Sequence, residues 1–431
     1  MSDQSAETPE VPLLTLRDGL TEVVDSRHRL DEVVAAMSSG SGPVAIDAER
    51  ASGYRYSQRA YLIQIRREGA GTALVDPIPF GELADLNQAF DGAEWILHAA
   101  SQDLACLREV GLHPTNLFDT ELAARLLGYP RVGLATLVEN ILGKSMRKEH
   151  SAVDWSQRPL PDPWLEYAAL DVEVLVELRE ILYAELVEQD KLTWAQEEFQ
   201  HLIDLRPTPR VDPWRRTSGL HKVKNRRSLA VVRELWTTRD QLAQKRDTTP
   251  GRLIPDSAIT TAALALPTSR QDLLRTKGFH GRGAKRYASQ WADAIDRALA
   301  LAEEELPRPA TRGDGVPQLR NWIDRDPDSA AQYLTAKARL QEFATERQLP
   351  LENLLTPDYL RRVVYRPPTG QADLVAGITN VLREFGARNW QVGITAPLIA
   401  EAMQSPDPLP AKEPKPESES EAKPGTGPGP K

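Results

Sequence analysis

Pro43-Val44-Ala45-Ile46-Asp47-Ala48-Glu49 is a short apolar run that carries two acidic residues near the start of the chain. Val44 and Ile46 are β-branched and follow a Gly-Pro turn signal, so the run predicts a buried strand. Because side chains alternate between the faces of a strand, Asp47 and Glu49 project to the same side. Two carboxylates at the end of a core strand repel each other, and a divalent cation commonly offsets that repulsion. The alternative is a strand that runs out into solvent with two ordinary surface acids.

The composition is that of a globular protein with several domains. The chain has 431 residues, of which 41% are hydrophobic and 27% charged, so we expect roughly two to four domains. Cys106 is the single cysteine, which excludes an intrachain disulfide and favours a reducing cytoplasm. The residues before Arg17 include no Lys, no Arg and no apolar segment, which argues against a secretory signal. No uncharged apolar run is long enough to span a membrane.

A basic segment interrupts this acidic chain. The formal net charge is -9, whereas residues 206–247 contain twelve Lys or Arg and four Asp or Glu, a local charge of +8. Such a segment is the electrostatic pattern expected of contacts with a nucleic-acid backbone. The alternative is a solvated helix face joined to a linker. Within the segment we expect four residues to contact phosphates: Lys222, Lys224, Arg226 and Arg227.

The first half of the chain alternates predicted strands and helices. A helix is expected over 29–37, followed by strands at 43–49, 61–66 and 72–76. The short links between these strands favour an antiparallel meander. Further on we expect helices near 80–90, 102–110, 119–128, 133–141 and 163–190, and a strand at 94–98. This order predicts an α/β layer architecture with a mixed sheet.

The second half of the chain is predicted to be helical. Helical patterning covers residues 228–305 and 318–404. The two blocks resemble degenerate copies, because residues 243–256 and 344–358 share Ala, Arg, Pro, Leu and Asp in the same order. This match indicates a duplicated helical domain. From Ser405 onward the chain is rich in Pro, Glu, Lys, Ser and Gly, so we expect that tail to be disordered.

Two further acidic positions are candidates to join the first pair. Asp103 lies at the predicted start of a helix, where a carboxylate also stabilises the helix dipole. Tyr167 and Asp171 stand four residues apart in a predicted helix and therefore share one face. The alternative for this pair is a surface tyrosine beside a solvated aspartate. Two alanines between them favour close approach of another element.

Together these residues resemble the DEDDy family of 3′-to-5′ exonucleases, and within it ribonuclease D. Three stretches support the likeness, in the same order along the chain: Phe118-Asp119-Thr120, Asp154-Trp155-Ser156-Gln157-Arg158-Pro159-Leu160 and Tyr167-Ala168-Ala169-Leu170-Asp171. The likeness covers most of residues 20–400. One departure is Arg50, which follows Glu49 where many relatives place an aromatic or apolar residue. It bears on how the terminal nucleotide is held.

The resemblance implies a ribonuclease H-like α/β exonuclease domain, with a mixed sheet flanked by helices. Two all-α domains similar to the helicase-and-ribonuclease-D C-terminal (HRDC) domain are expected to follow it. The expected boundaries are a disordered arm at 1–19, the exonuclease domain at 20–205, a linker at 206–218, the first HRDC domain at 219–304, a linker at 305–317, a second HRDC-like domain at 318–404 and a disordered tail at 405–431.

The resemblance also implies the catalytic residues. Asp47, Glu49, Asp103 and Asp171 would hold two divalent ions, Mg²⁺ or Mn²⁺, which agrees with the preference of hard cations for oxygen donors. Tyr167 would orient the attacking water rather than act as a full base, because a phenol is mostly protonated at neutral pH. Gln64 and Tyr61 are predicted to line the substrate groove. His98, Cys106 and Asp119 are expected to have structural roles, Asp119 as a helix cap.

The leading hypothesis is a metal-dependent 3′-to-5′ exoribonuclease that releases nucleoside 5′-monophosphates. Its expected substrates are tRNA precursors or other structured RNA 3′ ends, and we expect a cytoplasmic monomer without a membrane partner. One alternative keeps the fold and acts on DNA, because no motif reveals contacts to the 2′-hydroxyl. Another alternative is a non-catalytic RNA-binding module, which the presence of all four carboxylates and the tyrosine disfavours.

Overall fold

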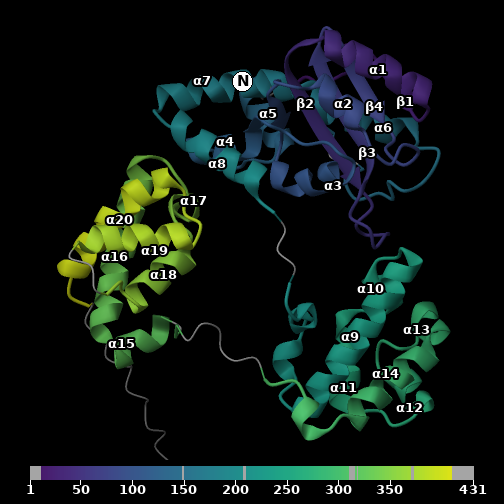
Figure 1. Cartoon of the computed structure of the whole chain (residues 1–431), viewed down its shortest axis with the longest axis vertical. Helices are drawn as coiled ribbons and strands as arrows, with labels where there is room; N and C mark the ends of the chain where they lie inside the picture. Colours follow the sequence, from purple (N-terminus) through teal and green to yellow (C-terminus); the bar gives the residue numbers. More distant parts are fainter. Residues whose placement is uncertain are drawn as a thin grey trace, which may run out of the picture.

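The computed structural model describes residues 11–147, 150–206, 210–309, 316–317, 319–369 and 373–409. The chain forms an α/β region built on one sheet, followed by two helical regions that each contact it (Figure 1). We call them the α/β region (β1 to α8), the first helical region (α9 to α14) and the second helical region (α15 to α20). This order confirms the predicted fold class.

A six-stranded mixed sheet forms the centre of the α/β region, with the strand order β1-β4-β3-β2-β5-β6. Its strands are Val23–Val24 (β1), Ser41–Arg50 (β2), Ala60–Glu68 (β3), Gly71–Val75 (β4), Trp95–Leu97 (β5) and Leu117–Asp119 (β6). β2, β3 and β4 form the predicted antiparallel meander. β1 pairs in parallel with β4, and β5 pairs in parallel with β2 and β6. β1 and β6 were not predicted, because neither lies in an apolar run as long as the one that predicted β5.

Eight α-helices surround this sheet in the part of the α/β region that the structure describes. They are Arg27–Ser39 (α1), Ala84–Ala89 (α2), Leu104–Glu109 (α3), Thr120–Leu127 (α4), Leu134–Leu142 (α5), Asp162–Glu173 (α6), Leu175–Glu188 (α7) and Leu192–Asp204 (α8). The helical stretch predicted at 163–190 is two helices, which meet at Val174. α6 lies across β2, β3 and β4, while α7 packs on β2 and β5.

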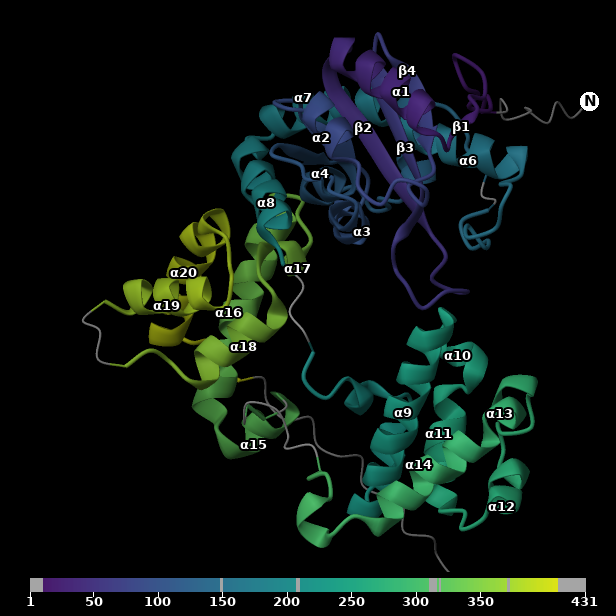
Figure 2. The ribbon, with the colours of Figure 1, turned by 45° about the vertical axis from the view of Figure 1, so that its right-hand side comes forward.

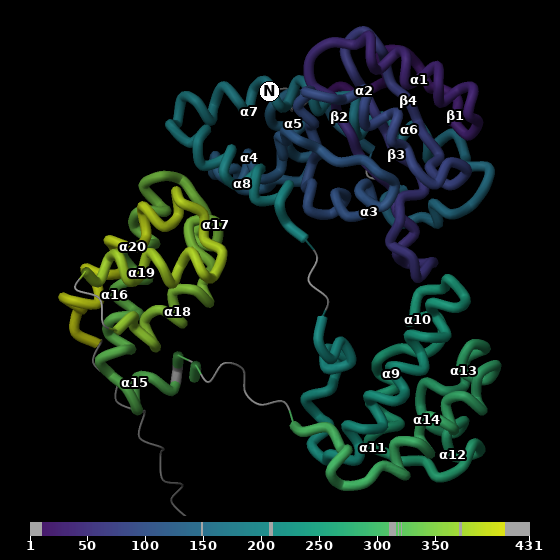
Figure 3. The backbone as a smooth tube through the Cα atoms, in the orientation of Figure 1, coloured from purple at the N-terminus to yellow at the C-terminus, as the bar shows by residue number. Residues whose placement is uncertain are grey.

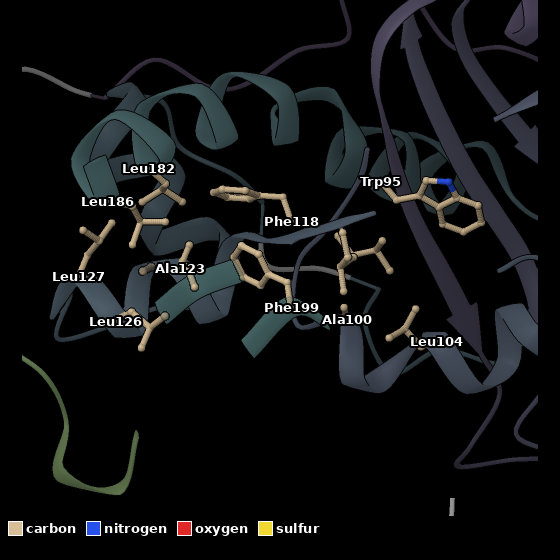
Figure 4. Close-up of a cluster of buried hydrophobic side chains, with 14 of the residues drawn as sticks. Trp95, Ala100, Leu104, Phe118, Ala123, Leu126, Leu127, Leu182, Leu186 and Phe199 are labelled. Atoms are coloured by element: carbon tan, nitrogen blue, oxygen red, sulfur yellow. The ribbon is translucent and has the colours of Figure 1, made fainter. Parts of the chain in front are cut away.

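Apolar side chains of α4, α7 and α8 pack around the short strand β6 (Figure 4). The rings of Phe118 on β6 and Phe199 on α8 have centroids 5.0 Å apart. Leu182 and Leu186 of α7 are fully buried in the same cluster. Burial of large apolar groups stabilises the fold by about 1.5–3 kcal/mol per side chain. The cluster thereby fixes the edge strand β6 beside β5, the strand from which the chain leaves toward Asp103.

The expected disordered arm at 1–19 is wrong for residues 11–19. Leu14 is buried, and its backbone N–H donates to the carbonyl of Ser145 over 2.9 Å. Arg17 forms an ion pair with the buried carboxylate of Glu173, at 3.1 Å. No apolar period is visible there, because these contacts are isolated ones to residues far along the chain. Residues 1–10 lie outside the described residues.

The two helical regions repeat one arrangement of helices. The first contains Arg226–Arg246 (α9), Pro250–Leu253 (α10), Asp256–Ala265 (α11), Arg270–Arg275 (α12), Arg282–Arg286 (α13) and Ala288–Ala300 (α14). The second contains Trp322–Arg325 (α15), Pro327–Glu346 (α16), Leu351–Leu354 (α17), Pro357–Tyr365 (α18), Leu374–Glu384 (α19) and Asn389–Gln404 (α20). In both, a long helix is followed by a four-residue helix and then by a third helix. The turn after the long helix passes through a left-handed residue, Asp247 or Gln348.

Several expected linker and tail residues belong to packed structure. Trp214, within the expected linker at 206–218, is buried in the core of the first helical region. Leu306, within the expected linker at 305–317, is buried in the same core. The backbone N–H of Asp407 donates to the hydroxyl of Thr335 over 2.8 Å, although the tail was expected to be disordered from Ser405. Residues 207–209, 310–315 and 410–431 lie outside the described residues.

Each helical region touches the α/β region at a different place (Figure 2, Figure 3). The loop of residues 51–59, between β2 and β3, meets α9 and α10 of the first helical region. Helix α8 meets α20 of the second helical region, where the rings of Trp194 and Trp390 stack with centroids 4.8 Å apart. None of the described helices is both long and apolar enough to cross a membrane.

Candidate active site

Three carboxylates from two elements converge at the predicted site. Asp47 and Glu49 extend from β2, and Asp171 extends from α6. Each offers an oxygen, and these oxygens all lie within 4.8 Å of one another. Strand alternation places the first two on one face of the sheet, and α6 packs across that face. Ala168 and Ala169 are fully buried between helix and sheet, which explains the close approach that their small side chains predict.

Asp103, the fourth predicted carboxylate, lies beside this trio but has a different partner. The chain leaves β5 through the 3₁₀ turn Ala100–Gln102 (η1), and Asp103 occupies the N-cap position of α3. Its side chain makes no capping hydrogen bond, so it does not satisfy the free N–H groups at the start of that helix. Instead, one carboxylate oxygen lies 3.5 Å from Nη2 of Arg50.

The four carboxylates have unusual acidities because they are crowded together, with Asp103 buried and the other three half-buried. Burial raises the pKa of Asp47 to about 6. Burial, followed by repulsion from neighbouring carboxylates, holds the pKa of Glu49, Asp103 and Asp171 well above the usual range. The positive charge of Arg50 opposes this shift at Asp47, Glu49 and Asp103. Raised pKa values mean that ionising all of these carboxylates is unfavourable, and a bound cation would stabilise their ionised forms.

Tyr167 lies one helical turn before Asp171, and the two side chains share a hydrogen bond. Burial, and then the charges of Asp171, Glu49 and Asp47, raise the pKa of the Tyr167 phenol. The phenol is therefore protonated at neutral pH. It can orient a water molecule but is a poor base.

His98, Cys106 and Asp119 have the structural roles expected of them. His98 Nδ1 lies 2.9 Å from the hydroxyl of Thr120, and burial lowers the pKa of this imidazole to about 4. Cys106 is buried in the core, and burial raises the pKa of its thiol to about 12. Asp119 caps α4 by accepting hydrogen bonds from the backbone N–H groups of Glu121 and Leu122.

Asp119 has a second role that the sequence did not reveal. Its carboxylate also accepts hydrogen bonds from the N–H groups of Ala99 (3.1 Å) and Ala100 (2.8 Å). Ala99 has a left-handed backbone with φ of 60°, a conformation that costs energy for a residue with a side chain. These bonds hold the turn that leads from β5 to Asp103. The spacing between the two segments gave no signal for this contact.

The motif at 154–160 also has a structural role. Arg158 Nε donates to the carboxylate of Asp76 over 2.5 Å, and Arg158 Nη2 donates to the carbonyl of Tyr61 over 2.7 Å. Trp155 is fully buried against the apolar residues between α6 and the sheet. These contacts fasten the segment before α6 to the ends of β3 and β4. They therefore position α6, which carries Tyr167 and Asp171, against the strand that carries Asp47 and Glu49.

The residues predicted to contact nucleic acid have different environments. Gln64 lies opposite Asp47 on the neighbouring strand and is fully buried, and Tyr61 is almost fully buried. Neither side chain reaches a surface that RNA could contact. Lys222 and Lys224 are exposed on the first helical region.

Arg226 and Arg227 point to carbonyl groups of their own region. Arg226 Nη2 donates to the carbonyls of Glu303 and Leu306. Arg227 Nη1 donates to the carbonyls of Ala298, Leu299 and Leu301 at the end of α14. The last carbonyls of a helix lack partners within the helix, so cationic side chains bind them readily. These guanidinium groups are engaged in the fold, while 38% of the Arg226 side chain and 24% of the Arg227 side chain remain exposed.

Three family models match the chain in this order. A 3′-5′ exonuclease model matches residues 21–187, an HRDC domain model matches residues 228–295, and a model of the 3′ to 5′ exonuclease C-terminal domain matches residues 315–403. The first contains all four carboxylates. The other two correspond to the two helical regions.

Named relatives and solved structures agree with these matches. Ribonuclease D of Zymomonas mobilis is 31% identical over 274 residues, which cover 62% of this chain and 70% of that protein. A crystal structure of a protein from Bifidobacterium adolescentis has 36% identity and a TM-score of 0.83, covering 92% of this chain and 100% of that one. The structure of Escherichia coli RNase D has the same fold, with 23% identity and a TM-score of 0.62 over 85% of this chain and 99% of that one. The chain belongs to the ribonuclease D family of 3′-to-5′ exonucleases.

Proposed function

We propose that this enzyme hydrolyses RNA from its 3′ end and releases nucleoside 5′-monophosphates, with two divalent ions, Mg²⁺ or Mn²⁺, bound to its carboxylates. The observation that carries the proposal is the convergence of Asp47, Glu49 and Asp171 within 4.8 Å. Asp103 stands beside them. Membership of the ribonuclease D family supports the choice of RNA.

The donor set fits hard divalent cations. All of the converging groups are carboxylates, which suit Mg²⁺ and Mn²⁺ rather than zinc. Asp47, Glu49 and Asp171 would hold one ion, and Asp47 with Asp103 would hold the second. When bound, such ions make a water molecule more acidic and stabilise charge on the departing oxygen. The raised pKa values of these carboxylates agree with a site completed by positive charge.

The chain's own residues position the reacting groups. Tyr167 holds its proton, so its hydroxyl oxygen can accept a hydrogen bond from the attacking water while its O–H donates to Asp171. Burial of the carboxylates lowers the local dielectric and strengthens their interaction with a bound cation. Asp119 and Arg158 hold the two segments that carry Asp103 and Asp171. In this proposal they act through position and do not touch the substrate.

The proposed substrates are structured RNAs with free 3′ ends, tRNA precursors among them. The exonuclease domain would comprise residues 20–205, and the HRDC-like domains at 219–304 and 318–404 would bind the body of the RNA. Exposed Lys222 and Lys224 remain candidates for phosphate contacts. We propose a cytoplasmic monomer.

The test is nucleotide release from a 3′-labelled RNA and from a DNA of the same sequence, with Mg²⁺ and with EDTA. Release from RNA that EDTA abolishes is expected. Asp171→Asn should lower the rate by about 100-fold or more, because it removes a metal ligand. Asp162→Asn is the matched control, since Asp162 is exposed at the start of the same helix.

Each other outcome has a distinct meaning. Equal release from DNA would overturn the preference for RNA. RNA binding without release would leave a non-catalytic module. An unchanged rate in Asp171→Asn would overturn the assignment of the site.

A further inference from the structure

Arg50 follows the metal-ligand candidate Glu49 directly and is the last residue of β2. The pairing of β2 with β3 is irregular at this point, because Glu49 pairs with Leu62 whereas Arg50 pairs with Ala60. Tyr61, which lies between Ala60 and Leu62 on β3, therefore has no paired residue on β2. Such a bulge increases the local twist of the strands and redirects side chains. The guanidinium of Arg50 consequently reaches the carboxylate cluster.

The contact that Arg50 makes is loose and partly accessible. Its Nη2 lies 3.5 Å from an oxygen of Asp103, which is longer than a charge-assisted hydrogen bond of about 2.7–2.9 Å. The Arg50 side chain is 27% exposed, while that of Asp103 is 7% exposed. A fixed structural pair would be shorter and more enclosed. Charge attraction therefore draws this guanidinium toward Asp103, and its exposed side leaves space for it to move away.

The cluster is divided into two parts. The oxygens of Asp47, Glu49 and Asp171 lie within 4.8 Å of one another, whereas Asp103 is the carboxylate that forms a direct ion pair with Arg50 among the described residues of the cluster. The first part is open to a divalent ion. The second part, Asp103, already has the guanidinium of Arg50 as its counter-ion.

We propose that Arg50 competes with the second divalent ion for Asp103, and that it turns to the phosphate of the terminal nucleotide when that ion binds. The inference rests on the proposed function, because it requires a metal site at these carboxylates. An arginine suits both positions, since its planar fork binds carboxylates and phosphates equally well. With four ionised carboxylates, Arg50 and two divalent ions, the site would have a net charge of +1. That charge matches the single negative charge of a phosphodiester.

The inference predicts effects of opposite sign on two ligands. Removing the guanidinium removes a competitor, so the weaker Mn²⁺ site should bind more tightly. The same change removes a phosphate contact, so a nucleotide product should bind less tightly. A purely structural Arg50 would instead weaken both interactions, because its loss would disorder the site.

The experiment is calorimetric titration of the full chain with Mn²⁺ in the absence of nucleic acid. Wild type is expected to bind two ions with different affinities. Arg50→Gln should tighten the weaker step by about ten-fold, since a unit charge a few ångströms away is removed. Arg50→Lys, which keeps the charge, should resemble wild type. Asp103→Asn should abolish the weaker step.

A second titration uses adenosine 5′-monophosphate with Mn²⁺ present. Arg50→Gln is expected to weaken its binding by about ten-fold, through loss of a charge-assisted contact. Arg59→Gln is the matched control in both titrations, because Arg59 is an exposed arginine next to Ala60, the residue opposite Arg50. It should leave both affinities unchanged.

The outcomes separate this inference from the proposed function. If wild type binds no Mn²⁺, both fail. If wild type binds two ions and Arg50→Gln leaves the weaker step unchanged or weakens it, the inference about Arg50 is overturned while the metal site stands.

Discussion

The two helical regions share one arrangement of helices but attach to the α/β region in different ways. The first is joined by polar contacts at residues 51–59: the Tyr56 hydroxyl donates to Asp240 over 3.1 Å, and the N–H of Ser57 donates to Asp247 over 3.1 Å. The second is joined by stacked aromatic rings, and its buried side chains continue the core of the α/β region. The first contact adjoins Glu49 and Arg50 along the chain, whereas the second lies on α8.

This difference indicates that the two regions contribute unequally. Burial of large apolar side chains stabilises more than exposed polar contacts do. The second region is therefore expected to contribute mainly to stability. The first is expected to contribute mainly to the position of the active-site loop.

The largest expected effect is at the aromatic contact. Trp390 is 7% exposed, and its indole N–H donates to Glu198 over 3.0 Å. Trp390→Ala should lower the free energy of unfolding by about 3–5 kcal/mol, through the cavity and the lost hydrogen bond. Urea denaturation followed by circular dichroism measures it. Val211→Ala is the control, since Val211 is 92% exposed; a loss at Trp390 no larger than the control's would contradict the comparison.

The next effect is confined to the α/β region, where the clustered carboxylates lie. Burial raises the pKa of Asp47 to about 6 from 3.8, so its contribution to stability is fully present below pH 3.8 and is lost as the pH rises through 6. Without metal, Asp47→Asn should therefore be more stable than wild type at pH 7.5, and the difference should shrink toward pH 4. Thermal unfolding of both proteins across this range checks the sign. A wild type that is the more stable at pH 7.5 without metal would contradict it.

Metal should reverse that order at neutral pH. Mn²⁺ at about 100 times its dissociation constant would stabilise wild type by about 2.7 kcal/mol. The gain should shrink at pH 5, where the carboxylates bind protons in competition with the metal. Asp171→Asn should lose most of the gain. Equal stabilisation of that variant would place the metal elsewhere.

A smaller effect separates two kinds of basic residue in the first helical region. Arg227 donates to carbonyls at the end of α14, so Arg227→Ala should lower the free energy of unfolding by about 1–2 kcal/mol. Lys222→Ala should leave it unchanged, because Lys222 is exposed. Thermal unfolding distinguishes the two. If both variants are equally stable, the hydrogen bonds of Arg227 contribute nothing.

The smallest change in stability is expected at the polar contact. Tyr56→Phe removes the hydrogen bond to Asp240 and should cost about 0.5–1 kcal/mol. We expect its kcat/KM on an RNA hairpin with a 3′ tail to fall by a factor of about three, which corresponds to less than 1 kcal/mol. The global unfolding midpoint should barely move. A variant that loses stability but keeps activity would reverse the assignment of roles.

The sequence predicted the elements whose own residues set their structure. The β2 strand and its two acids followed from alternation, and Tyr167 and Asp171 followed from helical spacing. The meander of β2, β3 and β4 followed from short links. The resemblance to a known family then added Asp103, whose own context favoured a residue that stabilises a helix start. These residues do lie together in the structure.

Contacts between distant segments were beyond the reach of sequence patterns. Nothing local indicates that Asp119 binds the turn at Ala99, or that residues 11–19 pack beside Ser145. A count of basic residues also cannot tell which guanidinium groups already bind carbonyls, as Arg226 and Arg227 do. Local charge density therefore does not separate the cations that bind within the fold from those that face solvent. The attachment of the helical regions likewise depends on pairs separated by more than a hundred residues.

The contacts of Arg158 change how its motif can be used to recognise related sequences. The side chain binds Asp76 and the carbonyl of Tyr61, and it touches none of the carboxylates that would bind metal. The motif at 154–160 thus indicates the fold rather than the catalytic activity. A related protein that has lost its acids but keeps this motif should still fold like an exonuclease without being one. Searches that infer activity from the motif alone would assign exonuclease activity to proteins that have only the exonuclease fold.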